Sequence, residues 1–307
     1  MKNDAKKRVG VLRGGEGRHY SPSIRKGGEI ISHISENLSD KYKVYDILVD
    51  KNGVWHINGV PTMPAELIHK VDVIWNTSHP SFSVALDNLA IPNVGHGFFS
   101  STLESSSEML REHMKQIDVE MPRSIILPVY QKDFDGPRER YAIKKAKEIH
   151  EKFPAPWIVK SFTPESNMGI HLAKTFNELV GAIEDGVQHG QSILVEEFIS
   201  GKVASFHSVP MFRGEDIYTF PLGNAYGHFS PEEKEKLASL AKNLHRHIGA
   251  EHYLKSDFIL TPKGKVYLLQ IDGMPDLSPD SHFSQVCISV GAQAHHVVDH
   301  ILKIALQ

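Results

Sequence analysis

Short apolar runs separated by longer amphipathic stretches repeat along the first hundred residues of the chain. This pattern predicts strands and helices in alternation, at residues 9–13, 21–38, 44–49, 71–75 and 82–90. Strands that alternate with helices are typical of a parallel sheet with helices on both faces. We therefore predict an αβ domain with a Rossmann-like parallel sheet over residues 1–104.

After residue 104 the apolar runs and amphipathic stretches no longer alternate regularly. Further helices are predicted at 105–115, 138–153, 176–187, 231–247, 284–290 and 294–306. Further strands are predicted at 125–128, 157–160, 192–199, 204–211, 217–222, 258–260 and 266–271. We group them into a central domain at 105–200 and a C-terminal domain at 201–307, and predict an α/β fold class with α+β organisation in these two domains.

The last two apolar runs predict a hairpin whose polar residues are candidate metal ligands. They flank the turn Thr-Pro-Lys-Gly at 261–264. Because side chains alternate along a strand, Gln270 and Asp272 project to one face, and Asp257 starts the partner strand. Oxygen ligands suit Mg²⁺, which usually takes one or two carboxylates plus substrate phosphates. A polar strand end facing water is the alternative for these three residues taken alone.

A second candidate site lies where a strand ends in Lys160 and a polar loop follows at 163–170. A lysine beside a loop rich in Ser, Asn and Gly places one cation and several amide donors around phosphate oxygens. A solvated lysine beside an ordinary turn is the alternative. The site therefore predicts nucleotide binding only in combination with other signals.

Net charge, cysteine content and the length of the apolar runs exclude several classes of protein. The net charge of −3 lacks the basic excess of a nucleic-acid binder. The one cysteine, Cys287, excludes an intrachain disulfide and a thiolate cluster for zinc. No apolar run approaches the ~18 residues of a membrane span, and the opening residues do not form a secretion signal. We expect a cytoplasmic enzyme with neither nucleic acid nor membrane as a partner.

Several segments resemble the D-alanine–D-alanine ligases, which are carboxylate–amine ligases of the ATP-grasp superfamily. Leu-Arg-Gly-Gly at 12–15 with Ser23 and Gly27, and the turn at 91–97, are similar to the family's first domain. The segments 156–160, 164–169 and 194–201 resemble its ATP-binding lid, and 268–275 with 278–282 resemble its metal and substrate segment. The resemblance covers essentially the whole chain. It implies a Rossmann-like domain followed by a two-domain ATP-grasp fold.

The resemblance also implies roles for individual residues. Nucleotide contacts fall on Lys160, Ser166, Asn167, Glu196, Glu197 and Ile199. Substrate contacts fall on His19, Asp276, Ser281 and His282. Catalytic roles fall on His19, Ser166 and Lys255, with Lys255 in place of an arginine that stabilises the developing oxyanion. The metal ligands are Asp257, Gln270 and Asp272.

The chain departs from the family's pattern at several of these sites. A phosphate-binding lysine aligns with Ser107, and Arg111, one helical turn later, is our candidate to replace it. Val203 aligns with the glutamate that binds ribose in the family. The loop near 223–230, which closes over the second amino acid in the family, is shorter here. Gln270 and Asp272 exchange the family's acid and amide, so that the formal charge is kept.

We therefore predict ATP-dependent ligation of two D-alanine molecules through an acyl phosphate, for peptidoglycan synthesis. The resemblance implies ATP and Mg²⁺ as cofactors, with two ions expected and Mn²⁺ as a substitute, and a homodimer. One alternative is a ligase for another small carboxylate and amine, indicated by His19, Asp276 and the short loop. The other is a non-catalytic nucleotide-binding relative, indicated by Ser107, Val203, Gln270 and Lys255.

Overall fold

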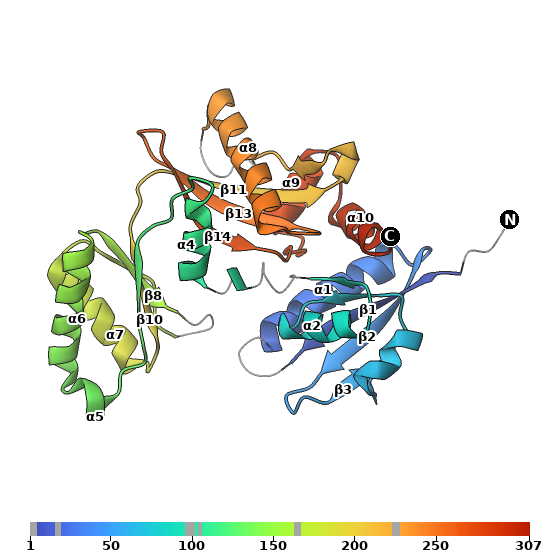
Figure 1. Ribbon diagram of the computed structural model, residues 1–307, viewed down its shortest axis with the longest axis horizontal. Coiled ribbons are helices and arrows are strands. Elements are labelled where there is room, and N and C mark those ends of the chain that lie inside the picture. Colours follow the sequence, from blue (N-terminus) through green and yellow to red (C-terminus); the bar gives the residue numbers. More distant parts are fainter. Residues whose placement is uncertain (1–4, 16–19, 96–101, 104–105, 163–166, 223–227) are drawn as a thin grey trace. The chain divides into compact units, whose positions relative to one another are not determined.

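The computed structural model describes residues 5–15, 20–95, 102–103, 106–162, 167–222 and 228–307 (Figure 1). The chain divides into two compact units. Unit 1 contains Met1–Ile117, Val203–Phe258 and Gln270–Gln307, and unit 2 contains Asp118–Lys202 and Ile259–Leu269. The division into three domains with boundaries at 104 and 200 stays a prediction.

The first sheet lies in unit 1 and has the strand order β4-β3-β2-β1-β5-β6. Its strands are β1 (Lys7–Gly14), β2 (Tyr42–Val49), β3 (Trp55–Ile57), β4 (Val60–Pro61), β5 (Val73–Asn76) and β6 (Asn93–Val94). Strands β2, β1, β5 and β6 run parallel as predicted, whereas β3 and β4 form an antiparallel edge that the pattern did not predict. Asn58 and Gly59 have φ of 50° and 81°, which a two-residue hairpin turn requires.

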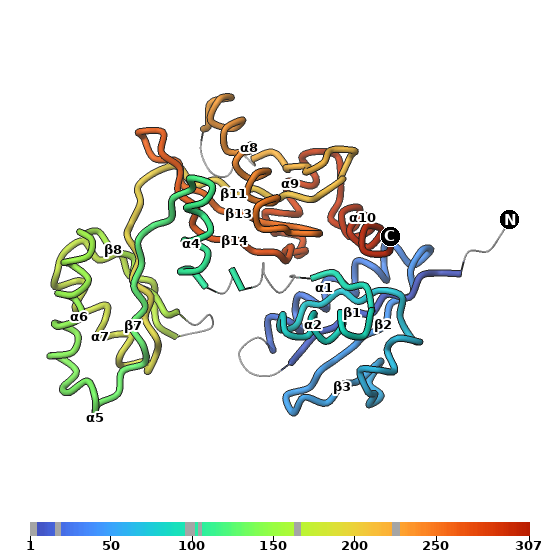
Figure 2. The backbone as a smooth tube through the Cα atoms, in the orientation of Figure 1, coloured from blue at the N-terminus to red at the C-terminus, as the bar shows by residue number. Residues whose placement is uncertain are grey.

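The helices of unit 1 are α1 (Tyr20–Asn37), α2 (Ser81–Asn88), α4 (Ser107–Lys115), α8 (Pro231–Ile248), α9 (His282–Ser289) and α10 (Ala294–Ala305), with a 3-10 turn at Pro64–His69. Of these, α1 and α10 pack against the first sheet and share a core with it. The last helix, in red, lies beside the first, in blue (Figure 2). Ile30 and Ile34 of α1 and Ile301 of α10 are fully or almost fully buried in the same core, with Trp75 of β5. Residues far apart in sequence thus share one apolar interior.

The second sheet belongs to unit 2 and is antiparallel, in the order β7-β10-β8-β9. Its strands are β7 (Ser124–Leu127), β8 (Trp157–Ser161), β9 (His171–Ala173) and β10 (Ile193–Glu197). Helices α6 (Arg138–Lys152) and α7 (Phe176–Gln188) lie side by side and share a core with the strands, and α5 (Lys132–Asp135) is a single short turn (Figure 1). Strands β8 and β10 of this sheet carry Lys160 and Glu197.

Two glycines of α7 give a test of how tightly unit 2 is packed. A Cβ at Gly186 would lie 2.5 Å from Cδ1 and Cγ1 of buried Ile193, whereas a Cβ at Gly181 would meet nothing within 4 Å. We expect Gly186→Ala to destabilise the protein by about 1–3 kcal/mol, because the helix must move off the sheet. Gly181→Ala should stabilise it by up to about 1 kcal/mol through helix propensity. Thermal unfolding measures both, and equal melting temperatures for the two variants would contradict the packing.

The third sheet carries the predicted hairpin and has the order β12-β11-β13-β14. Its strands are β11 (Lys202–Pro210), β12 (Ile217–Thr219), β13 (Leu254–Leu260) and β14 (Val266–Asp272), and a short 3-10 turn spans Phe212–Gly214. Strands β13 and β14 are neighbours joined by the turn at 261–265, in which the amide of Thr261 donates to the carbonyl of Lys265. The hairpin prediction is confirmed.

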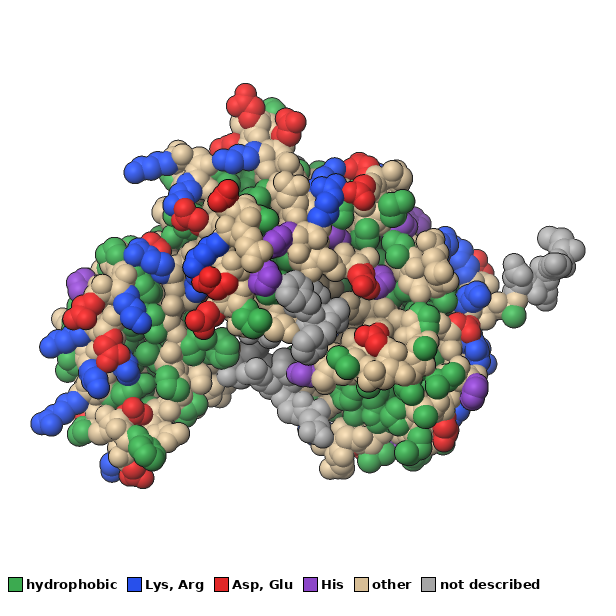
Figure 3. Space-filling view, viewed as in Figure 1, with side chains coloured by type: hydrophobic (Ala, Val, Ile, Leu, Met, Phe, Trp, Pro, Cys, Tyr) green, Lys and Arg blue, Asp and Glu red, His purple; other side chains and the backbone are tan. Residues whose placement is uncertain are grey.

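Every strand and helix predicted from the pattern is present within a few residues, and the α/β fold class is confirmed. On the face shown in Figure 3, acidic and basic side chains are interspersed rather than gathered by sign. Over the residues that the structure describes, none of the helices combines the length and apolar character that crossing a membrane requires.

Candidate functional site

The hairpin brings Asp257 and Gln270 into direct contact. Asp257 is 7% exposed, and its Oδ2 accepts a hydrogen bond of 2.7 Å from Nε2 of Gln270. Its Oδ1 accepts a bond of 2.5 Å from the hydroxyl of Ser205 on β11. The Nζ of Lys255 lies 3.0 Å from Oδ2. The carboxylate is therefore surrounded by three donors, one of them a cation, as a buried charge requires.

Asp272 has other contacts. Its Oδ1 accepts a hydrogen bond of 2.8 Å from the amide of Met274, and its Oδ2 lies 3.7 Å from Nζ of Lys26 on α1. The structure thus joins Asp257 to Gln270, as the hairpin predicted, and ties Asp272 to the loop that follows β14. Lys26 was not predicted, because its proximity to Asp272 arises only in the folded chain.

The donor chemistry of this hairpin suits one hard cation. Two carboxylates and an amide oxygen are the ligands that Mg²⁺ prefers when substrate phosphates complete its shell. Among the described residues, no group of three or more His, Cys, Asp and Glu side chains stands ready to hold a metal by itself. Lys255 already pairs with the charge of Asp257, and the amide of Gln270 donates to the same carboxylate, so a bound cation would compete with Lys255 for it.

The loop after β14 ends at a capped helix. Ser281 is the N-cap of α9, where its hydroxyl accepts a bond of 3.1 Å from the amide of Ser284 and donates to the carbonyl of Asp276 at 2.8 Å. The carboxylate of Asp276 accepts bonds from the amide and hydroxyl of Ser278. Burial opposes ionisation of Asp276, but these bonds hold its pKa below the usual value. The predicted acceptor residues Asp276, Ser281 and His282 thus occur together in one loop and helix start.

Strand β11 contacts both the hairpin residue Asp257 and the acceptor residue His282. Two residues apart on it, Ser205 donates to Asp257, and a ring nitrogen of His207 lies 2.8 Å from Nδ1 of His282. Phe206 between them packs edge-on against Phe258. The sequence interpretation missed Ser205 and His207. The signal that was available is the polar–apolar–polar alternation within an otherwise apolar strand.

The candidate nucleotide residues of unit 2 form two ion pairs. Nζ of Lys160 lies 2.6 Å from Oε2 of Glu196 on the neighbouring strand β10. Glu197 receives two bonds of 2.8 Å from the guanidinium of Arg123, which hold the pKa of Glu197 below its usual value. Arg123 was not predicted, since it lies far from Glu197 in sequence and contacts it only in the folded chain.

The structure gives few contacts for the remaining candidate residues. Ile199 is half-buried just after β10, and Asn167 is exposed. Ser166 lies outside the described residues, and so do His19 and the segment 223–227 within the shortened loop. Their roles stay predictions.

The opening glycine motif has a structural explanation in unit 1. The amide of Gly14 donates to the hydroxyl of Ser23 at 2.8 Å, so this amide does not face a ligand. A Cβ at Gly27 would lie 2.8 Å from Cβ of Arg13, which explains the need for glycine where α1 crosses β1. Ser107 begins α4, capped by Ser106, and Arg111 is half-buried on the same helix. Compensation by Arg111 for the missing lysine stays a prediction.

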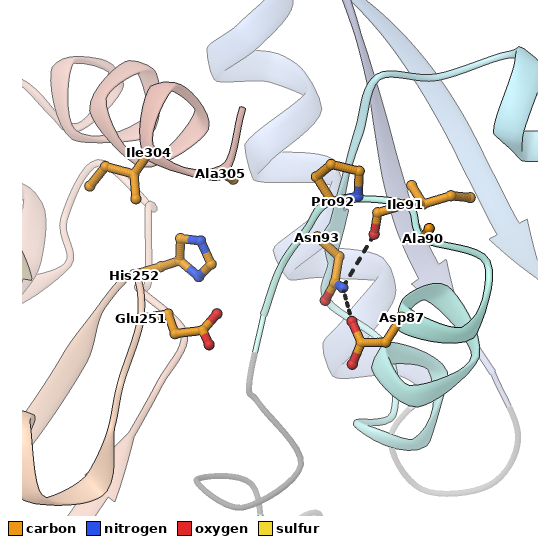
Figure 4. Close-up of a pocket in the computed structure, with 9 residues that line it drawn as sticks. All are labelled: Asp87, Ala90, Ile91, Pro92, Asn93, Glu251, His252, Ile304 and Ala305. Atoms are coloured by element: carbon orange, nitrogen blue, oxygen red, sulfur yellow. Dashed lines mark hydrogen bonds between the residues drawn. The ribbon is translucent and has the colours of Figure 1, made fainter. Parts of the chain in front are cut away.

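A pocket of about 580 Å³ lies elsewhere in unit 1 (Figure 4). Its lining residues are Asp87, Ala90, Ile91, Pro92, Asn93, Glu251, His252, Ile304 and Ala305. The amide of Asn93 donates to Asp87 on one side, while Glu251 and His252 lie on the other (Figure 4). None of the predicted site residues lines this pocket, so it is not the candidate site.

Proteins named as D-alanine–D-alanine ligases match this chain over nearly its whole length. A D-alanine–D-alanine ligase from Oceanobacillus iheyensis is 19% identical and covers 98% of this chain and 96% of its own length. A D-alanine–D-alanine ligase from Fervidobacterium nodosum is 22% identical, with 97% of this chain and 98% of its own length covered.

Solved structures show the same fold. The VanG D-Ala:D-Ser ligase from Enterococcus faecalis superposes with a TM-score of 0.74 at 16% identity, over 98% of this chain and 100% of the other. A D-alanine–D-alanine ligase from Bacillus anthracis complexed with ATP gives 0.70 at 18% identity, with 98% and 97% covered. At this level of identity the likeness shows the fold.

The sequence itself matches the family described as D-ala D-ala ligase C-terminus, over residues 119–207 and 224–303. These two segments together make up more than half of the chain and include the candidate lid, the hairpin and the acceptor loop. The protein therefore belongs to the D-alanine–D-alanine ligase family.

Proposed function

We propose that this protein joins two D-alanine molecules with ATP, through an acyl phosphate, and so supplies the dipeptide for peptidoglycan synthesis. The observation that carries the proposal is the cluster on the hairpin, where Asp257 contacts Gln270, Lys255 and Ser205. Family membership and the end-to-end match to relatives named D-alanine–D-alanine ligase support it.

The first half of the reaction makes the carboxylate of one D-alanine reactive. A carboxylate is a poor electrophile, so transfer of the ATP γ-phosphoryl group to it creates a better leaving group. This transfer depends on positioning and charge neutralisation rather than covalent help from the protein. Asp257, Gln270 and Asp272 would hold Mg²⁺, which would neutralise phosphate charge during the transfer. Lys160 would bind phosphate oxygens, and Glu196, Glu197 and Ile199 would contact the base.

The second half joins the amine of the other D-alanine to the activated carbonyl. Attack by the amine develops an oxyanion, and the ammonium of Lys255 stabilises negative charge there. The lysine ammonium is a point charge, whereas an arginine guanidinium would donate two hydrogen bonds in a fixed geometry. The interaction with the oxyanion is therefore less directional. Ser281 and His282 receive the carboxylate of the second amino acid, and His19 receives the first amino acid.

A different second substrate is the alternative that a specific observation favours. The carboxylate of Asp276 stands in the acceptor loop, where it is half exposed and 4.0 Å from Nη1 of Arg25. An acidic side chain at this position favours acceptors that carry a hydroxyl or amine. One structural neighbour, from Enterococcus faecalis, is named a D-Ala:D-Ser ligase.

Phosphate release measured over a panel of substrates tests the proposal. The purified protein is mixed with ATP and Mg²⁺ and with D-alanine alone, D-alanine plus D-serine, or L-amino acids, and the products are identified by mass spectrometry. We expect release with D-alanine alone and a dipeptide product. Release only with another pair would support the alternative. ATP binding without release under any condition would indicate a non-catalytic relative.

A further inference from the structure

Three side chains form a continuous hydrogen-bonded row next to the candidate acceptor site. The hydroxyl of Tyr253 lies 2.6 Å from Nδ1 of His207, and Nε2 of His207 lies 2.8 Å from Nδ1 of His282. Tyr253 immediately precedes β13, His207 lies in β11, and His282 is the first residue of α9. We call these three residues the Tyr253–His207–His282 row.

The inner members of the row are enclosed by apolar rings. His207 and Tyr253 are each 3% exposed, and the ring of Phe283 lies 5.1 Å and 5.4 Å from theirs. Burial lowers the pKa of His207 and raises the pKa of Tyr253, so both side chains are neutral near pH 7. A neutral imidazole carries one proton, so each of its nitrogens is either a donor or an acceptor.

The hydroxyl of Tyr253 decides which nitrogen carries the proton. Among the described residues, its hydrogen-bonding partner is His207. If this hydroxyl accepted a hydrogen bond from the protonated Nδ1 of His207, its own hydrogen would be buried without an acceptor, which costs about 1–3 kcal/mol. The favoured arrangement therefore has Tyr253 donating to Nδ1 of His207. Nε2 of His207 then carries the proton and donates to Nδ1 of His282.

We propose that Tyr253 and His207 are positioning residues that hold His282 in the neutral tautomer with its proton on Nε2. Resting on the proposed function, this inference makes His282 a fixed, uncharged donor to the carboxylate of the second amino acid. Two further features favour the neutral ring. His282 begins a helix, whose N-terminus disfavours a positive charge, and burial together with the nearby charge of Lys255 lowers the pKa of His282.

Nuclear magnetic resonance of the protein labelled with ¹⁵N-histidine tests the tautomer without any substrate. The His282 ring signals are assigned by their loss in His282→Phe. At pH 7.5 we expect the parent to show the proton on Nε2. Tyr253→Phe removes the biasing donor while keeping the ring, so both tautomers of His282 should then be populated. A parent with the proton on Nδ1, or a Tyr253→Phe spectrum identical to the parent's, would overturn the inference.

A matched control is available on the same strand. The hydroxyl of Ser208 lies 2.8 Å from Nδ1 of His245, which is buried but outside the row. Ser208→Ala also removes a buried bond to a histidine, and it should leave the His282 signals unchanged. A change in His282 as large as that in Tyr253→Phe would show that the effect is general loosening, and the inference would fail.

Kinetics then connects the tautomer to the substrate. If only the Nε2 tautomer binds, an even mixture raises the KM of the second amino acid about twofold in Tyr253→Phe, with the KM of ATP unchanged. His282→Phe should raise the KM of the second amino acid about tenfold. The double variant with Tyr253→Phe should have the same KM as His282→Phe alone. Independent, additive effects would refute action through His282. A parent that lacks ligase activity would contradict the proposed function and leave the spectroscopic result as it stands.

Discussion

Replacement of Asp257 by asparagine is expected to lower ATP-dependent phosphate release at least about a hundredfold, since the change removes a charge at the proposed phosphoryl-transfer site. Asparagine has nearly the same shape, and the hydroxyl of Ser205 still finds an acceptor at 2.5 Å. What is lost is the negative charge that the proposal assigns to the metal and that Lys255 contacts at 3.0 Å. An initial-rate assay at saturating ATP, Mg²⁺ and D-alanine measures the effect.

Loss of fold would lower the rate as well, so stability has to be measured alongside. The carboxylate of Asp257 is nearly buried while the Lys255 side chain is 28% exposed, so the lysine can recover some hydration. We expect a cost of about 1–3 kcal/mol, which leaves the protein folded at 25 °C. Asp216→Asn is the matched control, because it also removes a carboxylate that pairs with a cation in unit 1, Arg246 at 2.6 Å. Half or more of the parent rate in a folded Asp257→Asn would refute the proposed metal site.

The second large effect is expected at Lys160. Lys160→Ala should lower kcat/KM for ATP about a hundredfold, because it removes the cation proposed to face the phosphates. The lysine lies on β8 and pairs with Glu196 at 2.6 Å, and its side chain is 37% exposed. Such an exposed pair contributes at most about 1 kcal/mol to stability, so unfolding cannot account for the loss. Isothermal titration with ATP checks that binding weakens along with the rate.

Lys145→Ala is the control for this variant. Lys145 also belongs to unit 2 and pairs with a glutamate, Glu148, at 2.8 Å, but it lies on α6 away from the proposed phosphate residues. It should bind ATP as the parent does. Equal ATP affinity of Lys160→Ala and Lys145→Ala would show that Lys160 is a surface lysine paired with Glu196, which was the alternative interpretation.

Local signals in the sequence were sufficient for most of the elements and for the hairpin. The apolar runs on both sides of the turn at 261–264 predicted β13 and β14, and this hairpin accounts for the contact between Gln270 and Asp257. The antiparallel edge was missed even though its signal is local. Asn58-Gly59 is a strong hairpin dipeptide, but the strands on either side of it are too short to show a clear apolar pattern.

The partners of the site residues depended on the tertiary structure. Ser205 reaches Asp257 from 52 positions away, Arg123 reaches Glu197 from 74, and His207 reaches His282 from 75. Alternation and turn chemistry act over a few residues and carry no information on which strands become neighbours. The charged residues of the site can therefore be identified from the sequence. Which donors bind and orient those residues depends on the folded sheet.

The sequence by itself determined most of the helices and strands, the family and the oxygen and nitrogen groups available for chemistry, because these follow from residue type and short-range spacing. The tertiary structure decided that Asp257 is satisfied by three protein donors, that the Gly14 amide serves Ser23 rather than a ligand, and that His282 is held by a buried row. The physical reason is that burial and strand neighbours set the strength and direction of each hydrogen bond, and both arise only when distant segments pack together.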